Sequence, residues 1–307
     1  MRVFADVHVH NYLSRCCTDN AATAENFVKR YAELGIKTLG FANHIWDDRV
    51  PGASEWYHKQ TLAFSMQIKN QIPADTQGIK VLVGAETEYC GMTQTLGMSA
   101  EGAKELDFLL IPHSHVHMAN FVMADPAPIA ETRRRLKEQL MQIDGMTETL
   151  AEKWVSPLRE PQLHPFIQPP YEEWPAYLAE FLVASFESLM EHPELHRILE
   201  TTPVSVAHPF QPVGYGQYRN EMLQLISDET FARLFKKAAD LGIGLELNPN
   251  CGDPALIRMN AIAKEQGCKF TFGSDTHSIS SAERIFNVQA AVDALNLTEN
   301  DIMDFIR

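Results

Sequence analysis

The chain has 307 residues, with 26 Lys and Arg against 40 Asp and Glu, so its formal net charge is −14. Nucleic acids are held mainly by basic side chains that neutralise phosphates, and no basic patch is evident beyond Arg133, Arg134 and Arg135. A composition of 45% hydrophobic and 21% charged residues is that of a globular protein with an extensive core. We therefore do not expect a disordered, fibrous or nucleic-acid-binding protein.

The N-terminal residues and the cysteines indicate a compartment. The opening MRVFADVHVH carries polar residues where a signal peptide needs an apolar run, and no apolar stretch approaches the roughly 20 residues that span a bilayer. The five cysteines form an odd, widely spaced set, unlike the disulfide framework of a small secreted domain. We therefore expect a cytoplasmic protein without a membrane partner.

Short apolar runs alternate with amphipathic segments along most of the chain. The predicted strands are residues 3–9, 38–42, 80–87, 107–111, 204–207, 244–247 and 270–272. Segments such as 24–35 and 229–242 have helical periodicity and end in a glycine suited to a helix C-terminus. Strands and helices in this order predict an α/β fold of parallel strands with right-handed crossovers. The pattern alone leaves a doubly wound sheet and a closed barrel as alternatives.

Residues 118–200 break this alternation. Two helical patterns, PIAETRRRLKEQLMQI and WPAYLAEFLVASFESLM, flank a stretch that contains Pro157, Pro161, Pro165, Pro169, Pro170 and Pro175. Prolines at this density exclude a continuous helix. We predict a single domain over residues 1–307 with a helical, proline-rich insertion at 118–200, after the fourth strand. Such an insertion is expected to act as a lid or as an oligomerisation element, and a homo-oligomer is a possible partner state.

Histidines gather where the predicted strands end. Of the twelve histidines, eight lie at or just past the C-terminal end of a strand, namely His8, His10, His44, His113, His115, His117, His208 and His277. The ends of parallel strands are where α/β folds build their sites. Structural histidines would appear on helices as readily, so this distribution predicts a functional role.

Carboxylates accompany the histidines on the first and third strands. In the first strand, a period of two predicts that Asp6, His8 and His10 point to one face. The third strand directs Glu86 and Glu88 to a common face. A buried carboxylate is costly without a partner, so these glutamates need a metal ion or a basic group.

The remaining strand ends add further metal-binding side chains. His44 follows the second strand, PHSHVH follows the fourth, His208 follows the fifth, and Asp275 and His277 follow the seventh. Imidazole and carboxylate groups are the usual ligands of zinc, manganese and iron. Their number predicts a centre with more than one metal ion.

This ordered set of motifs resembles the PHP (polymerase and histidinol phosphatase) family. The resemblance rests on D-x-H-x-H at 6–10, N-H at 43–44, G-x-E at 84–86, the histidines after the fourth strand, A-H-P at 207–209 and S-D-x-H at 274–277. Members are metal-dependent phosphoesterases built on a distorted seven-stranded barrel. The resemblance therefore implies a (β/α)7 TIM-like barrel and two to three divalent ions, which are zinc, manganese or iron.

The resemblance also implies a distribution of ligands. The first ion would be bound by His8, His10, Glu86 and Asp275. Glu86 would also bind the second ion, together with His115 and His208. The third ion would be bound by His44, His277 and Cys16. Many relatives have a histidine where this chain has Cys16. A thiolate binds zinc well, so a softer metal is favoured there.

Several residues keep more than one interpretation. Of the three histidines after the fourth strand, His115 is favoured as the ligand because it best matches the family pattern, whereas His113 and His117 are open as supporting groups, substrate contacts or loop residues. His117, Arg49 and Arg219 are the candidate substrate contacts. Glu246, at the end of the sixth strand, is expected to support the site and not to bind metal.

The predicted chemistry is hydrolysis of a small phosphomonoester by a metal-bound hydroxide supported by Glu86 and Asp275. The alternatives are a metal-dependent amidohydrolase or lactonase acting on a carbonyl substrate, a nuclease, and a non-catalytic metal-binding regulator. The acidic composition argues against the nuclease. The near-complete ligand set argues against the regulator.

Overall fold

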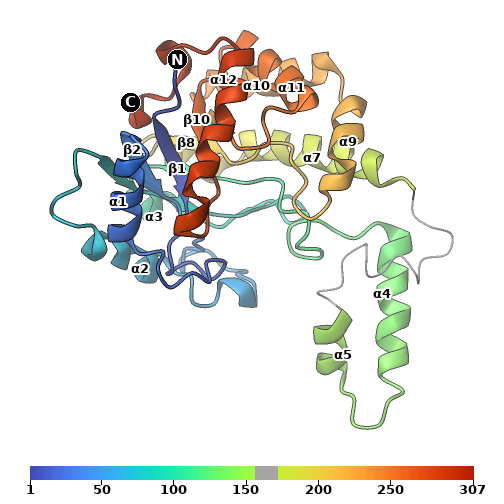
Figure 1. The fold of residues 1–307 in the computed structure, drawn as a ribbon. Helices are drawn as coiled ribbons and strands as arrows, with labels where there is room; N and C mark the ends of the chain where they lie inside the picture. Colours follow the sequence, from blue (N-terminus) through green and yellow to red (C-terminus); the bar gives the residue numbers. More distant parts are fainter. Residues whose placement is uncertain (156–171) are drawn as a thin grey trace.

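Parallel strands form the centre of the protein, as the computed structural model of residues 1–155 and 172–307 shows (Figure 1). The strands at the seven predicted positions are β1 (Ala5–Val9), β2 (Thr38–Phe41), β3 (Lys80–Val83), β4 (Ala85–Glu86), β7 (Leu109–Leu110), β8 (Val204–Val206), β9 (Gly244–Leu247) and β10 (Phe270–Phe272). The third predicted strand is divided into β3 and β4. A short antiparallel hairpin, β5 (Tyr89–Cys90) and β6 (Thr95–Leu96), was not predicted.

The strands pair in two sheets. One has the order β1-β2-β3 and the other β10-β9-β8-β7-β4, and every pair within them is parallel. Isolated parallel bridges join Val9 to Thr276, just after β10, and His44 to Glu86 in β4. The fold is thus a barrel-like α/β arrangement, but regular pairing does not close the predicted seven-stranded ring.

One aromatic ring explains why glycines occur in the central strands. A Cβ atom on Gly84, between β3 and β4, would lie 2.6 Å from the ring of Phe108, and one on Gly40 in β2 would lie 2.9 Å from the same ring. Phe108 is fully buried and stacks on Phe305 at 5.3 Å between ring centroids. Its ring therefore fills the interior where these strands converge.

Replacing Gly40 with alanine is expected to destabilise the fold by about 1–3 kcal/mol, the usual cost of overpacking a core. The new methyl group would meet the Cα and Cβ atoms of Val7 at 2.8 Å, and backbone cannot move aside cheaply. Urea unfolding measures the loss. Gly216→Ala is the matched control, because apart from residues adjacent along the chain no described atom lies within 4 Å of its added Cβ. Equal stability of the two variants would contradict this packing.

Helices cover the strands, and both predicted examples are present. Helix α1 (Ala24–Glu33) is capped by the side chain of Thr23, and α10 (Asp228–Asp240) by that of Ser227. The other helices outside the insertion are α2 (Leu62–Ser65), α3 (Ala100–Ala103), α9 (Arg219–Leu225), α11 (Pro254–Glu265) and α12 (Gln289–Ala294). No helix in the described ranges is long and apolar enough to cross a membrane.

The predicted insertion consists of two different parts. Helices α7 (Trp174–Met190) and α8 (Pro193–Leu199) pack on the body, whereas α4 (Ala127–Leu140) and α5 (Glu148–Val155) form a hairpin that projects from it (Figure 1). Pro175 lies in the first turn of α7, where proline is tolerated. The other five predicted prolines, Pro157, Pro161, Pro165, Pro169 and Pro170, lie outside the described residues.

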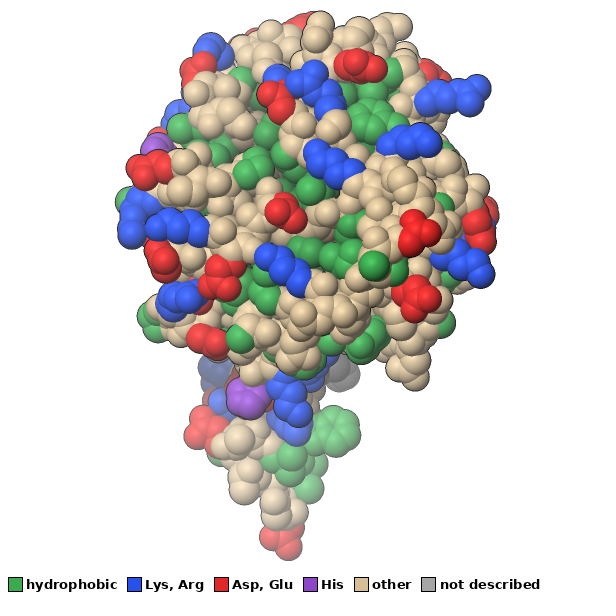
Figure 2. All heavy atoms as spheres, turned by 90° about the vertical axis from the view of Figure 1, so that its left-hand side faces the viewer, with side chains coloured by type: hydrophobic (Ala, Val, Ile, Leu, Met, Phe, Trp, Pro, Cys, Tyr) green, Lys and Arg blue, Asp and Glu red, His purple; other side chains and the backbone are tan. Residues whose placement is uncertain are grey.

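The projecting hairpin exposes large hydrophobic side chains. They are Met141, Ile143, Leu150 and Trp154, and Trp154 is the most exposed, at 63%. Figure 2 shows the hairpin extending below the body with hydrophobic groups on its surface. Such patches are typical of contact surfaces. The exposed side chains are compatible with the predicted role as a lid or an oligomerisation element, which stays a prediction for this hairpin.

Candidate metal centre

The carboxylate of Glu86 lies at the centre of the predicted site. Glu86 ends β4 and is 1% exposed. Its Oε2 atom lies 3.2 Å from His8 Nε2, 3.4 Å from His10 Nε2 and 3.2 Å from His44 Nδ1. These three histidines come from the ends of β1 and β2, which are neighbours in the first sheet.

The second oxygen of Glu86 faces a different pair of imidazoles. Oε1 lies 3.2 Å from His208 Nε2 and 3.6 Å from His115 Nε2. His115 follows β7 and His208 follows β8, so this pair belongs to the five-stranded sheet. A carboxylate whose two oxygens face separate donor groups has the arrangement that bridging between two cations requires.

Four sets of three donor atoms lie close enough to share an ion. Within each set the atoms are no more than 4.8 Å apart, and the sets are His8, His10, Asp275; His10, His44, Glu86; Glu86, His115, His208; and His10, Cys16, His277. All nine predicted metal ligands occur in these sets. The structure thus brings together side chains from strand ends across both sheets.

Partners on the far side of the rings hold three of these histidines in place. His8 Nδ1 lies 2.6 Å from Glu246 Oε1, His115 Nδ1 lies 2.8 Å from Glu88 Oε2, and His208 Nδ1 lies 2.9 Å from Ser114 Oγ. Each bond leaves Nε2 directed at Glu86. Such outer partners fix the orientation of metal-binding histidines.

The donor set fits divalent cations. Among the described residues, His8 Nε2, both ring nitrogens of His10 and His44 Nδ1 are buried without a hydrogen-bond partner. Burying polar atoms without partners is costly, and coordination of a cation would satisfy them. Zinc, manganese and iron all accept imidazole and carboxylate ligands.

The electrostatics of the cluster favour a charged carboxylate. Burial would raise the pKa of Glu86, but His44 and His8 hold it well below its usual range. Burial likewise opposes ionisation of Cys16, yet the charge of the neighbouring His10 lowers the pKa of this thiol to about 3. The cluster therefore holds several anionic donors close to imidazoles.

Asp275 lies at the open side of the cluster. Its carboxylate is 43% exposed, and Oδ1 lies 3.3 Å from His10 Nε2. The backbone there is in the left-handed region, with φ of 52°, and His208 shares this feature with φ of 30°. Backbone conformations of this kind cluster at functional sites, where surrounding structure holds them.

The prediction that Asp6 shares a face with His8 and His10 is wrong. Its Oδ2 accepts a hydrogen bond from Tyr31 Oη at 2.5 Å, and Oδ1 accepts one from the Ser274 amide at 2.9 Å. The pairing of β1 with β2 shifts register between Asp6 and Val9, so the alternation of faces does not continue through the strand. Asp6 instead anchors the segment that carries Asp275.

The three histidines after β7 have separate places. His115 lies in the cluster, whereas His113 is fully buried, and its Nε2 accepts a hydrogen bond from the Phe210 amide at 3.1 Å. Burial lowers the pKa of His113 to about 3, so it is a neutral packing group. His117 lies beside His115, with ring centroids 5.5 Å apart, where it remains a candidate substrate contact.

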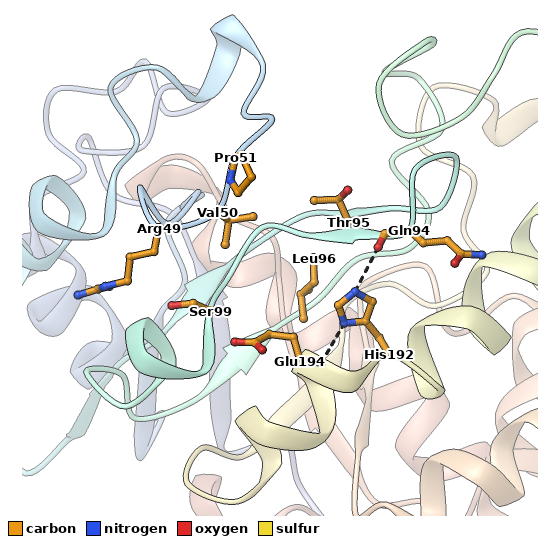
Figure 3. A pocket seen from close by; sticks show the side chains of 9 residues that line it. All are labelled: Arg49, Val50, Pro51, Gln94, Thr95, Leu96, Ser99, His192 and Glu194. Carbon is orange, nitrogen blue, oxygen red and sulfur yellow. Dashed lines mark hydrogen bonds between the residues drawn. The ribbon is translucent and has the colours of Figure 1, made fainter.

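The two predicted arginine contacts are not brought to the cluster. Arg49 pairs with Asp47 and Glu105, and Arg219 pairs with Asp253. In the described ranges no hydrogen bond or ion pair joins either guanidinium to a predicted ligand. Arg49 lines a separate depression of about 320 Å³ with His192 and Glu194, from which its guanidinium points away (Figure 3). Nearby carboxylates already neutralise both charges, which does not favour binding of a phosphate.

Aromatic residues of the segment after β2 complete one wall, and sequence reasoning missed them. Trp56 packs edge-on against His44 at 4.8 Å between ring centroids, and Tyr57 Oη donates a hydrogen bond to Glu88 at 3.0 Å. Both lie in a single turn of 3-10 helix, Glu55–Tyr57, which has no strand-end signal to identify it.

Changing Glu246 to glutamine is expected to weaken metal binding about 10–100-fold, the usual effect of losing an outer partner. Glu246 accepts hydrogen bonds from both His8 Nδ1 and the His208 amide, whereas an amide side chain has one oxygen and cannot replace both. Competition with a fluorescent chelator measures the affinity. Glu265→Gln, on the exposed end of α11, is the control; equal affinities in the two variants would contradict this role.

Comparison with known proteins identifies the fold. The sequence matches no family model and no curated protein. The structure resembles histidinol phosphate phosphatase from Lactococcus lactis subsp. lactis, solved with zinc, L-histidinol and phosphate, with a TM-score of 0.52 and 14% identity, covering 99% of this chain and 100% of that one. N-isopropylammelide isopropylaminohydrolase from Burkholderia multivorans gives a TM-score of 0.37 and 12% identity, covering 91% and 61%. The first match confirms a PHP-like fold.

Proposed function

We propose that this protein is a metal-dependent phosphomonoesterase acting on a small phosphorylated metabolite. The observation that carries the proposal is the division of the Glu86 carboxylate between two groups of imidazoles, with Oε2 facing His8, His10 and His44 and Oε1 facing His115 and His208. A fold shared with a phosphatase that holds zinc and phosphate supports it. The proposal includes a distorted seven-stranded barrel and a cytoplasmic location.

The nine predicted ligands would hold two to three divalent ions of zinc, manganese or iron. Glu86 would be shared by two of them, with His8, His10 and Asp275 on one side and His115 and His208 on the other. When bound, such ions lower the pKa of coordinated water and neutralise charge on a phosphoryl group. A local positive centre of this kind lets an acidic protein bind a phosphate ester.

The protein's own side chains would orient and shield the reacting groups. Glu246, Glu88 and Ser114 fix the imidazole rings, so the donor atoms are in place before substrate arrives. Asp275 is part of the cluster and also reaches the open side, where a substrate can enter. Trp56 covers His44 and reduces access of bulk water from that wall.

Release of inorganic phosphate from a panel of monoesters tests the proposal. The panel holds histidinol phosphate, sugar phosphates, amino-alcohol phosphates and nucleotides, with amides and lactones as a parallel set. We expect phosphate release from at least one monoester after loading with zinc or manganese. Hydrolysis confined to the amides or lactones, or no hydrolysis by metal-loaded protein, would contradict the proposal.

A further inference from the structure

One metal-binding set differs from the others because it contains sulfur. Cys16 lies in the loop after β1, and its thiol belongs to the set with His10 and His277, whose donor atoms are within 4.8 Å of one another. His44 lies beside this set, because its ring stacks on that of His10. The other three sets in the described ranges contain only nitrogen and oxygen donors.

The imidazoles around Cys16 stack on one another, and several of their nitrogens are buried. The ring of His10 stacks between those of His277, at 4.5 Å between centroids, and His44, at 4.7 Å. Both ring nitrogens of His10 and Nδ1 of His44 are buried and lack hydrogen-bond partners among the described residues. A buried imidazole with both nitrogens unsatisfied is independent evidence for a ligand at this position.

The neighbouring Cys17 has a different environment, although it is next to Cys16 in the sequence. Its Sγ donates a hydrogen bond to the carbonyl oxygen of His277 at 3.0 Å, and it belongs to none of the four donor sets. Cys17 is 8% exposed, whereas Cys16 is half-buried. The two thiols therefore have separable roles, which makes Cys17 a matched control.

Sulfur changes which metal the position prefers. Thiolates are soft ligands that favour zinc, whereas manganese and magnesium prefer carboxylate, carbonyl and water oxygens. A thiolate together with imidazoles is a typical zinc ligand set. The positions around Glu86 have only imidazole and carboxylate donors, which several metals accept.

We propose that Cys16, with His10, His44 and His277, forms a sulfur-ligated metal position that selects zinc over manganese within the cluster. The inference rests on the proposed function only because it concerns the same metal centre. It adds a position at which the preference for zinc over manganese is stronger than at the neighbouring positions, because one of its donors is a thiolate.

Cobalt substitution tests the sulfur ligand directly. A thiolate bound to cobalt(II) gives an intense charge-transfer absorption in the near ultraviolet, whereas imidazole and carboxylate ligands do not. Wild-type protein reconstituted with cobalt is expected to show this band, Cys16→Ser and Cys16→His to lose it, and Cys17→Ser to retain it. Cys16→His keeps a ligand at the position, so its metal content reports that the cluster still forms.

Metal competition tests the selectivity. After dialysis against equal concentrations of zinc and manganese, wild-type protein and Cys17→Ser are expected to retain a higher ratio of zinc to manganese than Cys16→His, because the thiolate adds to the general preference of nitrogen and oxygen donors for zinc. Absence of the band in wild type, its survival in Cys16→Ser, or unchanged zinc retention in Cys16→His would overturn the inference. Neither measurement requires catalytic turnover. The charge-transfer band without phosphate release would contradict only the proposed function. Phosphate release without this band would contradict only the present inference.

Discussion

Changing Glu86 to glutamine is expected to reduce hydrolysis of the preferred phosphate ester by at least ~10³-fold, because the metal ions supply several kcal/mol of transition-state stabilisation. An amide keeps the size of the side chain but removes the charge that faces five imidazoles. A neutral oxygen is also a poor bridge between two cations. Elemental analysis is therefore expected to show fewer bound ions per chain together with the lost activity.

Glu105→Gln is the control for this change. The carboxylate of Glu105 is half exposed, and its one ion pair in the described ranges is with Arg49 at 3.4 Å, so its charge is remote from the cluster. This variant is expected to keep both metal content and activity. Glu86→Gln with full activity and a full metal complement would show that the cluster is not the reaction centre.

Removing the metal ions with a chelator is expected to lower Tm by on the order of 10 °C. Ligands that bind only the folded state stabilise it by about 4 kcal/mol at 1,000 times Kd, and each kcal/mol shifts Tm by about 2–4 °C in a large domain. In the stripped protein the unpaired nitrogens of His8, His10 and His44 remain buried. Scanning fluorimetry before and after chelation, and after zinc is restored, measures the change.

Glu86→Gln provides the comparison for this experiment as well. Because this variant is expected to bind fewer ions, its Tm should respond less to chelator and to added zinc than the Tm of the parent protein. A parent Tm that is the same with and without chelator would mean that no ion is bound by the folded state in preference to the unfolded chain.

The strand ends were well predicted from the sequence because parallel strands present their C-terminal residues at one side. That rule predicted that His8, His44 and His208 lie in one region without any knowledge of the sheet order, and all three contact Glu86. Glu246, which was expected to support the site, accepts hydrogen bonds from His8 and from the His208 amide. The ligand roles themselves remain predictions until metal binding is measured.

Other features depend on contacts that periodicity does not encode. The break between β3 and β4 falls at Gly84, where a Cβ atom would meet the ring of Phe108 from a later part of the chain. The displacement of Asp6 follows from a register shift between two strands. The β5–β6 hairpin has strands of two residues each, too short for a period to be recognised.

The ion pairs of the two predicted arginine contacts could not be foreseen for a related reason. Arg49 and Arg219 follow strand ends, as phosphate-binding arginines do, but sequence position does not reveal the partner of a long side chain. Asp47 forms an ion pair with the guanidinium group of Arg49, and Asp253 forms one with that of Arg219. Similarly, Trp56 contacts His44 from a short 3-10 turn, and the sequence does not reveal where tertiary contacts place this turn.

Anomalous scattering from crystals of the zinc-loaded protein tests the central claim most directly. Maps calculated from data at the zinc absorption edge are expected to show two or three peaks inside the cluster, one of them between Glu86 Oε1 and the Nε2 atoms of His115 and His208. Zinc peaks confined to other parts of the surface, with none beside Glu86, would contradict the existence of this metal centre.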